Sequence, residues 1–158
     1  MKKIVVLTLF VFLSAYAFSQ QPLYRYYNGK IKKHYYTINF NEFGNGANDW
    51  ALEGPTCLVL NAEDRQRGVV PLLRYFNPQT GDHYYTVHRH ELGGGANGYN
   101  LEGIACYIFK FRAEGTLPLF EYYNGKTGDH FYTADRNELG RGFEGYQFVG
   151  IAGFVFHR

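Results

Sequence analysis

Polar and apolar positions alternate over a short stretch that starts three times along the chain. In its first copy Tyr24 and Tyr26 fall on one face and Arg25 falls on the other. Such an alternation predicts a β-strand with one packed face and one solvated face. The two kinds of position recur as Arg25, Arg74 and Glu121, and as Tyr26, Tyr75 and Tyr122. We therefore expect the tyrosines to point into one shared core and the charged residues to face water.

This stretch opens a longer unit that repeats without a gap. The three copies span residues 22–60, 71–109 and 118–156, and short connectors join them at 61–70 and 110–117. Each copy contains a strand, a turn led by Asn, a second strand, a short helical turn, a Gly-rich loop and two further strands. The chain is therefore predicted to be all-β, with four short strands in each unit.

Three such units favour a β-trefoil, in which the copies close around a threefold axis and share one core. Closure also removes exposed strand edges, which would otherwise pair with other chains. A propeller needs about four blades or more, so three units fit that fold poorly. An open three-unit β array is the alternative.

Residues 1–19 have the pattern of a signal peptide. Lys2 and Lys3 precede an apolar run from Ile4 to Leu13, and small residues follow that run. The run is shorter than the roughly 20 apolar residues that a membrane-spanning helix needs. We expect cleavage after Ser19, with cleavage after Ala17 as the alternative. Cleavage after Ser19 leaves residues 20–158 as a single domain of three repeats, secreted to the extracellular space or the periplasm, with no membrane span.

Charge and cysteine content narrow the possible partners. The whole chain has 16 Lys and Arg against 14 Asp and Glu, so loss of Lys2 and Lys3 leaves a formally neutral chain. A neutral chain argues against nucleic acid or an anionic membrane as partner, because both select a concentrated basic surface. Cys57 and Cys106 occupy a slot that the third repeat fills with Gly153. That slot favours a small buried site over a disulfide.

Several polar positions are identical in all three copies. They are Asn28, Asn77 and Asn124; His34, His83 and His130; and Glu42, Glu91 and Glu138. Each Asn is expected to begin a turn, and each Glu to complete a capping box after an N-cap such as Asn39 or Asp135. Each His is expected to bond the preceding turn beside Asp82 or Asp129. A threefold zinc site is the alternative, but no paired ligand stands near any of these histidines. We predict neither a metal nor a cofactor.

Fixed blocks within the units resemble a known repeat family. TGDHYYT at 80–86 and TGDHFYT at 127–133 are each preceded by RYFN or EYYN and followed by ELG and then LEGIACYIF or VGIAGFVF. This pattern resembles a secreted bacterial and fungal repeat whose units run roughly YRFYN, TGDHFYT, EGIAGYVF, and which is catalogued as a domain of unknown function. The resemblance implies an accessory or binding role. The first unit departs from it, with Lys32 and Lys33 where the other units have Gly-Asp.

The repeated residues do not form a pattern typical of catalysis. A hydrolytic triad needs a nucleophile, a base and a group that orients the base. Paired acids for sugar cleavage need one carboxyl with a pKa raised by burial, whereas the repeated acids of this chain fall at expected caps and loops. We predict that the chain is not an enzyme.

The sequence favours a lectin-like, carbohydrate-binding module with up to three weak sites for a glycan or cell-wall polysaccharide. An aromatic residue after each Gly-rich loop offers a ring for stacking, and nearby amide or carboxylate groups offer hydrogen bonds to hydroxyls. The predicted ligand-binding residues are Trp50, Tyr99, Tyr146, Asn48, Asn97 and Glu144. The alternative is a protein-interaction or hydrolase-inhibitor domain that binds its partner through the connector at 61–70.

Overall fold

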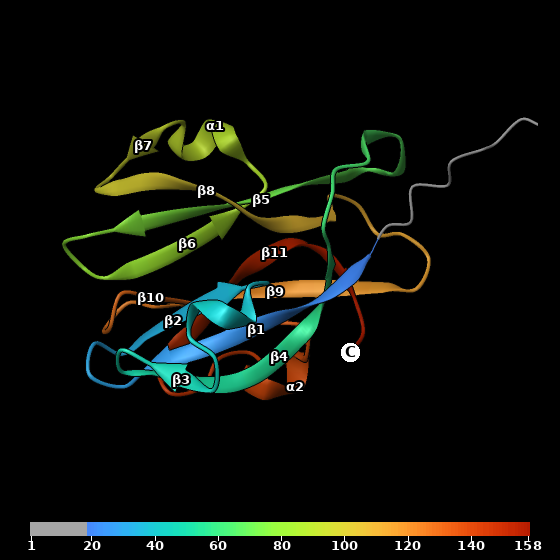
Figure 1. Cartoon of the computed structure of the whole chain (residues 1–158). Coiled ribbons are helices and arrows are strands. Elements are labelled where there is room, and N and C mark those ends of the chain that lie inside the picture. Colours follow the sequence, from blue (N-terminus) through green and yellow to red (C-terminus); the bar gives the residue numbers. More distant parts are fainter. Residues whose placement is uncertain (1–18) are drawn as a thin grey trace, which may run out of the picture.

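The computed structural model describes residues 19–158, which are mostly β-strand (Figure 1). The predicted signal peptide, apart from its last residue, lies outside this range. No helix within the described range is long and apolar enough to cross a membrane.

The repeats of the sequence correspond to three similar series of elements. The first contains β1 (Gln20–Asn28), β2 (Lys33–Thr37), the 3-10 helix η1 (Phe40–Glu42), β3 (Gly46–Ala47) and β4 (Trp50–Leu60). The second contains β5 (Val69–Asn77), β6 (Asp82–Thr86), α1 (Arg89–Leu92), β7 (Gly95–Ala96) and β8 (Tyr99–Phe109). The third contains β9 (Thr116–Asn124), β10 (Asp129–Thr133), α2 (Arg136–Leu139) and β11 (Tyr146–Phe156), while η2 (Arg65–Arg67) lies in the first connector.

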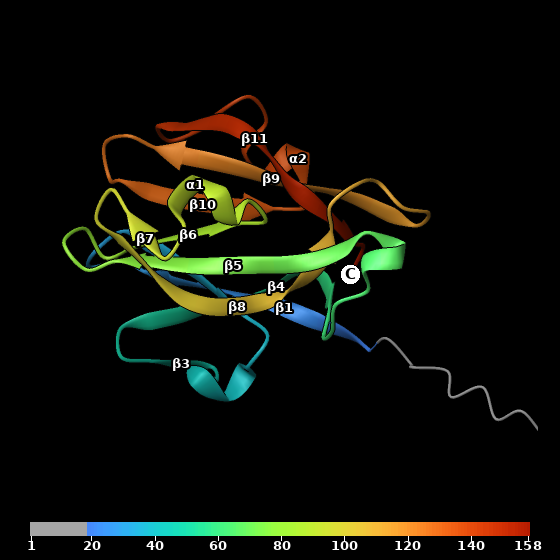
Figure 2. The ribbon, with the colours of Figure 1, turned by 90° about the horizontal axis from the view of Figure 1, so that it is seen from above.

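In each series the long first strand pairs antiparallel with two later strands. β1 pairs with β2 and β4, β5 with β6 and β8, and β9 with β10 and β11. Figure 2 shows β5 beside β8 and β9 beside β11. Isolated pairs such as Leu60 with Tyr107 then join β4, β8 and β11, which gives the strand order β10-β9-β11-β4-β8-β5-β6. The all-β prediction is confirmed. The strand order is that of an open antiparallel sheet, whereas a β-trefoil is closed. The β-trefoil therefore stays a prediction.

The turn after each long first strand forms as the sequence indicates. In the first turn the side-chain oxygen of Asn28 accepts hydrogen bonds from the backbone N–H groups of Lys30 and Ile31. Asn77 and Asn124 make the same pair of bonds in their own turns. A short polar side chain that mimics a backbone acceptor is the usual reason for Asn in this position.

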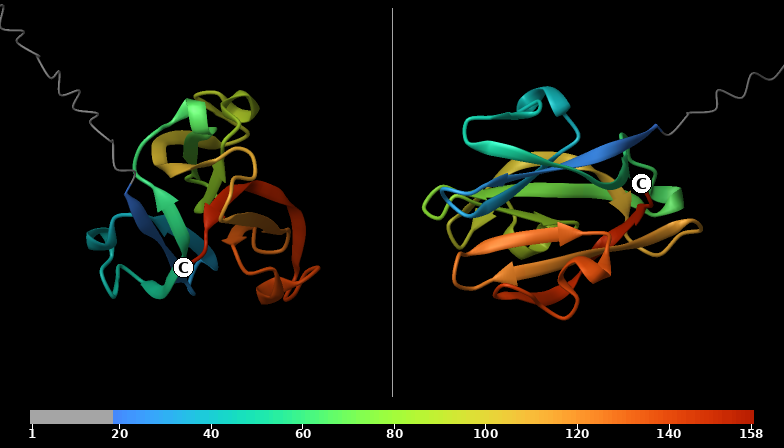
Figure 3. Two further views of the ribbon diagram at one scale, coloured as in Figure 1. Left: turned by 90° about the vertical axis from the view of Figure 1, so that its right-hand side faces the viewer. Right: turned by 90° about the horizontal axis from the view of Figure 1, so that it is seen from below.

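One hydrophobic core takes residues from all three series, and tyrosines link its parts. The hydroxyl of Tyr85 accepts from the backbone N–H of Tyr36 (2.8 Å) and donates to the carbonyl of the same residue (3.0 Å). Tyr132 makes this pair of bonds to Tyr85, and Tyr36 makes it to Tyr132. The three rings meet edge to face and are fully buried among the residues of the shared core. β2, β6 and β10 are therefore joined in a cycle where the three segments of chain meet (Figure 3).

The predicted orientation of the first strands is wrong. Tyr26, Tyr75 and Tyr122 are fully buried, but each hydroxyl donates to a loop carbonyl of its own series, at Gly44, Gly93 and Gly140. The opposite face of β1 looks inward: Leu23 belongs to the shared core, and the Arg25 guanidinium stacks 4.5 Å from the centre of the Phe131 ring. Alternation shows which residues share a face. It does not show which face meets the core when a loop covers the other.

The two cysteines are free and buried, as the repeat slot indicates. Both lie in the shared core, and burial raises the pKa of the Cys57 thiol to about 12. The third repeat needs glycine there, because a Cβ on Gly153 would lie 2.5 Å from Ile108 Cδ1 and 2.9 Å from the carbonyl oxygen of Phe109. The slot is therefore determined by packing.

Candidate functional site

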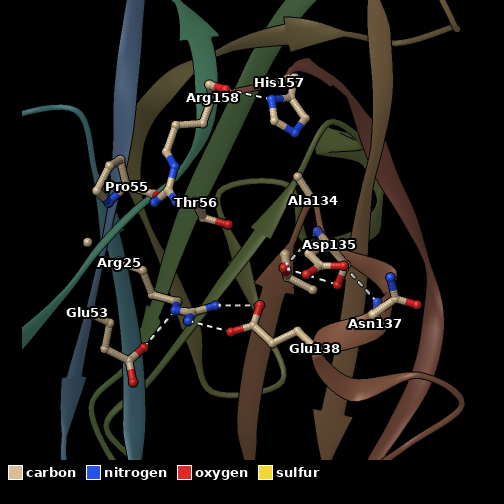
Figure 4. Close-up of a pocket in the computed structure, with 12 residues that line it drawn as sticks. Arg25, Glu53, Pro55, Thr56, Ala134, Asp135, Asn137, Glu138, His157 and Arg158 are labelled. Carbon is tan, nitrogen blue, oxygen red and sulfur yellow. Dashed lines mark hydrogen bonds and ion pairs between the residues drawn. The ribbon is translucent and has the colours of Figure 1, made fainter.

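A polar cavity of about 630 Å³ lies between the first and third repeats (Figure 4). β1 and β4 supply one wall, the end of β10 together with α2 supplies the other, and the last two residues of the chain close one end. Its lining comprises Arg25, Glu53, Gly54, Pro55, Thr56, Thr133, Ala134, Asp135, Asn137, Glu138, His157 and Arg158. The cavity therefore brings together segments that are more than a hundred residues apart in the sequence.

Arg25 organises the centre of this cavity. Its Nε donates to Glu53 (2.6 Å), while Nη1 and Nη2 donate to the two carboxylate oxygens of Glu138 (3.1 and 2.6 Å). The fork of a guanidinium matches a carboxylate in this bidentate way, and such bonds are stronger than neutral ones. The Phe131 ring under the guanidinium holds its plane. Both carboxylates are thus fixed by one largely covered cation.

The electrostatics keep Glu138 ionised. Burial raises the pKa of its carboxyl, but the hydrogen bonds from Arg25 and Thr133 lower it more, and the pKa is lowered overall. An ionised carboxylate accepts hydrogen bonds and donates none. The centre of the cavity is consequently an acceptor for the hydroxyl or amine hydrogens of a ligand.

The remaining lining residues provide polar groups around this centre. Asp135 accepts from the backbone N–H of Asn137 (2.8 Å), which fixes the start of α2. Asn137 is exposed, and Arg158 donates from Nη1 to the carbonyl of Pro55 (3.1 Å). Thr56 adds a hydroxyl at the opposite wall. The cavity therefore offers hydrogen-bond donors and acceptors from two walls and from the chain terminus.

The ion pair between Arg25 and Glu53 has an equivalent in the second repeat but none in the third. In the second repeat Arg74 donates to Glu102 (2.7 Å), and its guanidinium lies 4.8 Å from the centre of the Tyr35 ring. The third repeat has Glu121 and Val149 at these two positions. Glu121 is buried, so the prediction that this position faces water is wrong in all three repeats: Arg25 and Arg74 are also largely covered. Each of these side chains lies against a neighbouring repeat.

Glu121→Gln is expected to stabilise the protein at pH 8. Burial is the largest cause that raises the pKa of Glu121 to about 7; His130 opposes it, while Glu91 and Asp82 add to it. A carboxyl with a raised folded-state pKa loses stability as pH rises from about 4.5 through 7, because the unfolded chain ionises first. The variant should gain about 2 to 3 kcal/mol at pH 8 and nothing below pH 4 in urea unfolding. A gain that is equal at both pH values, or a similar gain for the exposed control Glu114→Gln, would argue against a buried ionisation.

The aromatic positions predicted to bind ligand are engaged within the protein. The hydroxyls of Tyr99 and Tyr146 donate to the buried carboxylates of Asp82 and Asp129, both at 2.5 Å. The ring of Trp50 packs 5.7 Å from Phe43. All three rings are half-buried.

The polar residues predicted beside these rings lie at turns. Asn48, Asn97 and Glu144 have φ angles of 53°, 54° and 52°, a left-handed region that Asn adopts more readily than most residues. They are exposed and precede β4, β8 and β11. Neither they nor the three aromatic residues line the cavity that the described residues form.

Comparison with known proteins places the chain in a family. The family model described as "Domain of unknown function (DUF5648)" matches residues 12–60 and 22–156. The chain belongs to the DUF5648 family. No curated protein and no solved structure matches it.

The repeated histidines of this DUF5648 chain connect different repeats. Asp129 accepts from the backbone N–H of His34 (2.8 Å), and His34 Nδ1 lies 2.6 Å from the same carboxylate. Asp82 holds His130 in the same way (3.0 and 2.6 Å). The prediction that each His bonds its own preceding turn is therefore wrong, because the carboxylate comes from another repeat.

The first repeat of the DUF5648 chain breaks this pattern in a coordinated way. Lys33 stands where Asp82 and Asp129 stand, and its ammonium donates to the carbonyls of Thr127 and Gly128 (both 2.6 Å). His83, the residue that an acid there would hold, has an Nδ1 with no hydrogen-bond partner within the described chain. Burial, followed by the charge of Arg74, lowers the pKa of His83 to about 3. Trp50 replaces the tyrosine whose hydroxyl would donate to the missing acid.

The repeated glutamates do not complete capping boxes. Glu42 accepts from the Tyr35 hydroxyl (2.5 Å), Glu91 accepts from Tyr84 and Thr86, and Glu138 binds Arg25. Asn39 and Asp135 do cap their helical turns, as predicted. The glutamate three residues after each cap instead binds a tyrosine hydroxyl or an arginine of a neighbouring repeat.

Sequence reasoning missed the cavity of this DUF5648 chain, although the repeats contained a signal for it. Arg25 with Glu53, and Arg74 with Glu102, change together to Glu121 with Val149. A paired change between copies of one unit indicates contact between the two positions. The partner Glu138 lies in another repeat and gave no such signal.

Proposed function

We propose that the chain is a secreted, non-catalytic carbohydrate-binding module, and that the polar cavity between the first and third repeats holds the sugar. The observation that carries this proposal is the pair of carboxylates fixed by Arg25 at the centre of the cavity. Rigid acceptors surrounded by amide, hydroxyl and guanidinium groups suit a ligand with many hydroxyls, since each sugar hydroxyl both donates and accepts.

The size of the cavity supports a small segment of glycan. Sites for small ligands usually have volumes of about 300 to 1,000 Å³, and this one has about 630 Å³. The formal charge of the chain without Lys2 and Lys3 is zero, which suits an uncharged ligand. A single site of this kind should be weak, with a dissociation constant near the millimolar range.

The electrostatics support binding over cleavage. A glycosidase needs one carboxyl whose raised pKa keeps it protonated as a general acid. In the cavity burial raises the pKa of Glu138, but the hydrogen bonds from Arg25 and Thr133 together with the charges of Arg25 and His34 lower it overall. Glu53 is bonded by the same guanidinium. Two carboxylates held by one cation act as fixed acceptors.

The predicted ring sites remain a second place for glycan contact. Trp50, Tyr99 and Tyr146, with Asn48, Asn97 and Glu144, stay a prediction. We place the main site in the cavity because the hydroxyls of Tyr99 and Tyr146 are already donated to buried carboxylates. The number of equivalent sites also falls below three, because the third repeat lacks the Arg–Glu pair.

The proposed function is joined by a proposal about the symmetry of the fold. We infer that an approximate threefold axis relates the repeats, as in the predicted β-trefoil, and that it passes through the cycle of Tyr36, Tyr85 and Tyr132. The cyclic hydrogen bonds support this, since each repeat gives one hydroxyl and accepts another. Each pair of neighbouring repeats would then form one groove, and the cavity would be one of the three.

The alternative function, a protein-interaction or inhibitor domain, also stays a prediction. The connector at 61–70, which would bind a protein partner, contains ion pairs of its own. They join Arg65 to Glu63 (2.8 Å) and Arg67 to Asp64 (3.2 Å). These charges are partly used within the connector. We therefore favour the cavity as the site of recognition.

A variant with two changes in the cavity is expected to lose glycan binding about tenfold or more. Thr56→Ala introduces the residue that the other repeats carry at this position, and Asn137→Ala removes an exposed amide, so neither disturbs the core. Loss of two hydrogen bonds to a sugar costs about 1 to 3 kcal/mol. Affinity electrophoresis on cellulose derivatives, xylan, chitosan and soluble peptidoglycan fragments measures the loss.

Asn41→Ala is the matched control for this experiment. Asn41 and Asn137 occupy the same position of the repeat, and the backbone N–H of each is bonded by a capping side chain. Only Asn137 lines the cavity. Equal retardation of the wild type and the double variant on every polysaccharide that retains them would move the site away from the cavity.

A further inference from the structure

A second cluster of polar side chains lies on the helical turn of the second repeat. His88, His90 and Glu91 are exposed, and one potential ligand atom from each lies within 4.8 Å of the others. The two imidazole rings are 5.5 Å apart between centres. Three such atoms at the surface are close enough to converge on one ion.

This cluster replaces a helix cap that the other repeats retain. The first and third repeats have Asn39 and Asp135 at the position of His88, and each accepts a hydrogen bond from the backbone N–H two residues later. No side chain of the described residues caps α1. Replacing such a cap usually costs about 0.5 to 2 kcal/mol. The second repeat thus loses a stabilising cap where it gains two imidazoles.

The carboxylate of Glu91 is held in place. Its Oε2 accepts from the Tyr84 hydroxyl (2.8 Å) and from Thr86 Oγ1 (3.0 Å). Ligating carboxylates in metal sites are commonly oriented by such hydrogen bonds. Its second oxygen, Oε1, accepts none of the hydrogen bonds found between described residues.

The surroundings of Glu91 also favour a cation. Glu138, the equivalent of Glu91 in the third repeat, is neutralised by Arg25. The residue equivalent to Arg25 that would neutralise Glu91 is Glu121, a second acid. Burial raises the pKa of Glu121, and the charge of Glu91 adds to that rise, so the two acids lie within electrostatic reach. The first and second repeats have an arginine at the position of Glu121. Glu91 therefore faces a second acid where Glu138 faces Arg25.

We propose that His88, His90 and Glu91 bind a divalent transition-metal ion, with Zn²⁺ as the ion that their chemistry suits best. Two imidazole nitrogens and one carboxylate oxygen are a common three-ligand set for zinc, with water in the fourth position. A hard ion such as Mg²⁺ or Ca²⁺ prefers oxygen ligands and is disfavoured by the two imidazoles. This site is separate from the sugar cavity and does not depend on the proposed function.

The test compares zinc binding by the wild-type chain and by the variant His88→Asp with His90→Asn. This double change restores the Asp-x-Asn-Glu pattern of the third repeat, so the cap should return and folding should be preserved. Isothermal titration with ZnCl₂ at pH 7.5 should show one ion bound to the wild type and a loss of about 100-fold or more in the variant. Saturating Zn²⁺ should raise the unfolding temperature of the wild type only.

Glu114→Gln serves as the control for non-specific zinc binding at the surface. It removes an exposed carboxylate outside the cluster and outside the cavity, and should leave zinc affinity unchanged. A wild type that binds no Zn²⁺ at 100-micromolar concentration, or a double variant that binds Zn²⁺ as tightly as the wild type, would overturn the proposal. Tighter binding of Mg²⁺ than of Zn²⁺ would overturn it as well.

Discussion

Tyr85→Ala is expected to cost at least about 5 kcal/mol, a large share of the stability of the protein. Removing a large, fully buried aromatic side chain costs about 3 to 5 kcal/mol, and the Tyr85 ring is fully buried in the shared core. The change also removes the hydroxyl that bonds both the backbone N–H and the carbonyl of Tyr36. Each buried backbone group left without a partner adds about 1 to 3 kcal/mol. Domains of this size are stable by only about 5 to 15 kcal/mol.

Tyr85→Phe separates the hydrogen bonds from the packing. It keeps the ring and should cost about 2 to 4 kcal/mol in urea unfolding, because two backbone groups lose their partner. Tyr75→Phe is the matched control: its ring is equally buried, but within residues 19–158 its hydroxyl donates to the Gly93 carbonyl alone. That variant should cost about 1 kcal/mol. A smaller loss for Tyr85→Phe than for Tyr75→Phe would show that the tyrosine cycle is not what holds the repeats together.

Asp82→Ala is expected to cost about 3 to 5 kcal/mol at pH 7. The buried carboxylate accepts from the His130 backbone N–H and the Tyr99 hydroxyl, and it lies 2.6 Å from His130 Nδ1. Removing the acid leaves those groups buried without their partner, which is the costly way to break a buried polar network. Urea unfolding gives the loss directly. The exposed cap variant Asp135→Ala should cost only about 1 kcal/mol.

The pH dependence of the Asp82→Ala difference provides a second check. Burial raises the pKa of Asp82, but the hydrogen bonds from His130 and Tyr99 lower it more, so its folded-state pKa lies below the unfolded value. Such a carboxylate contributes stability above its unfolded pKa of about 4, and that stability is lost as pH falls through the folded pKa. The difference between wild type and variant should therefore shrink below pH 4. A difference that is the same at pH 7 and pH 2.5 would contradict an ionised, hydrogen-bonded Asp82.

Local features of the fold were predictable because they depend on neighbouring residues. Asn28 leads its turn by bonding the next N–H groups, and Asn39 caps the next helical turn in the same way. Identity between repeats made these positions visible in the sequence. The small slot at Cys57 and Gly153 was predictable for the same reason, since repeats that share a fold must fill the same space.

Features that depend on contact between repeats were not predictable from one sequence. Asp82 stands directly before His83, yet it holds His130 of the next repeat. Lys33 and Trp50 look like two unrelated departures from the repeat until the contact of Trp50 with His83, between the first and second repeats, is known. The same limit applies to Arg25, whose partner Glu138 is far away in sequence. Periodicity gives the face of a strand, but not the neighbour that the face meets.

The central claim is that a glycan binds in the cavity around Arg25. Trp50 is the single tryptophan of the chain, so its indole N–H reports on the predicted ring sites, while Arg25 Nε–H reports on the cavity. The most direct measurement is a set of ¹H–¹⁵N correlation spectra during titration with a hexasaccharide from the best-retained polysaccharide. Our account predicts that the Arg25 Nε and Asn137 side-chain signals shift together, while the Asn41 side chain and the Trp50 indole do not. Shifts at the Trp50 indole without shifts at Arg25, or no shifts with any glycan, would contradict it.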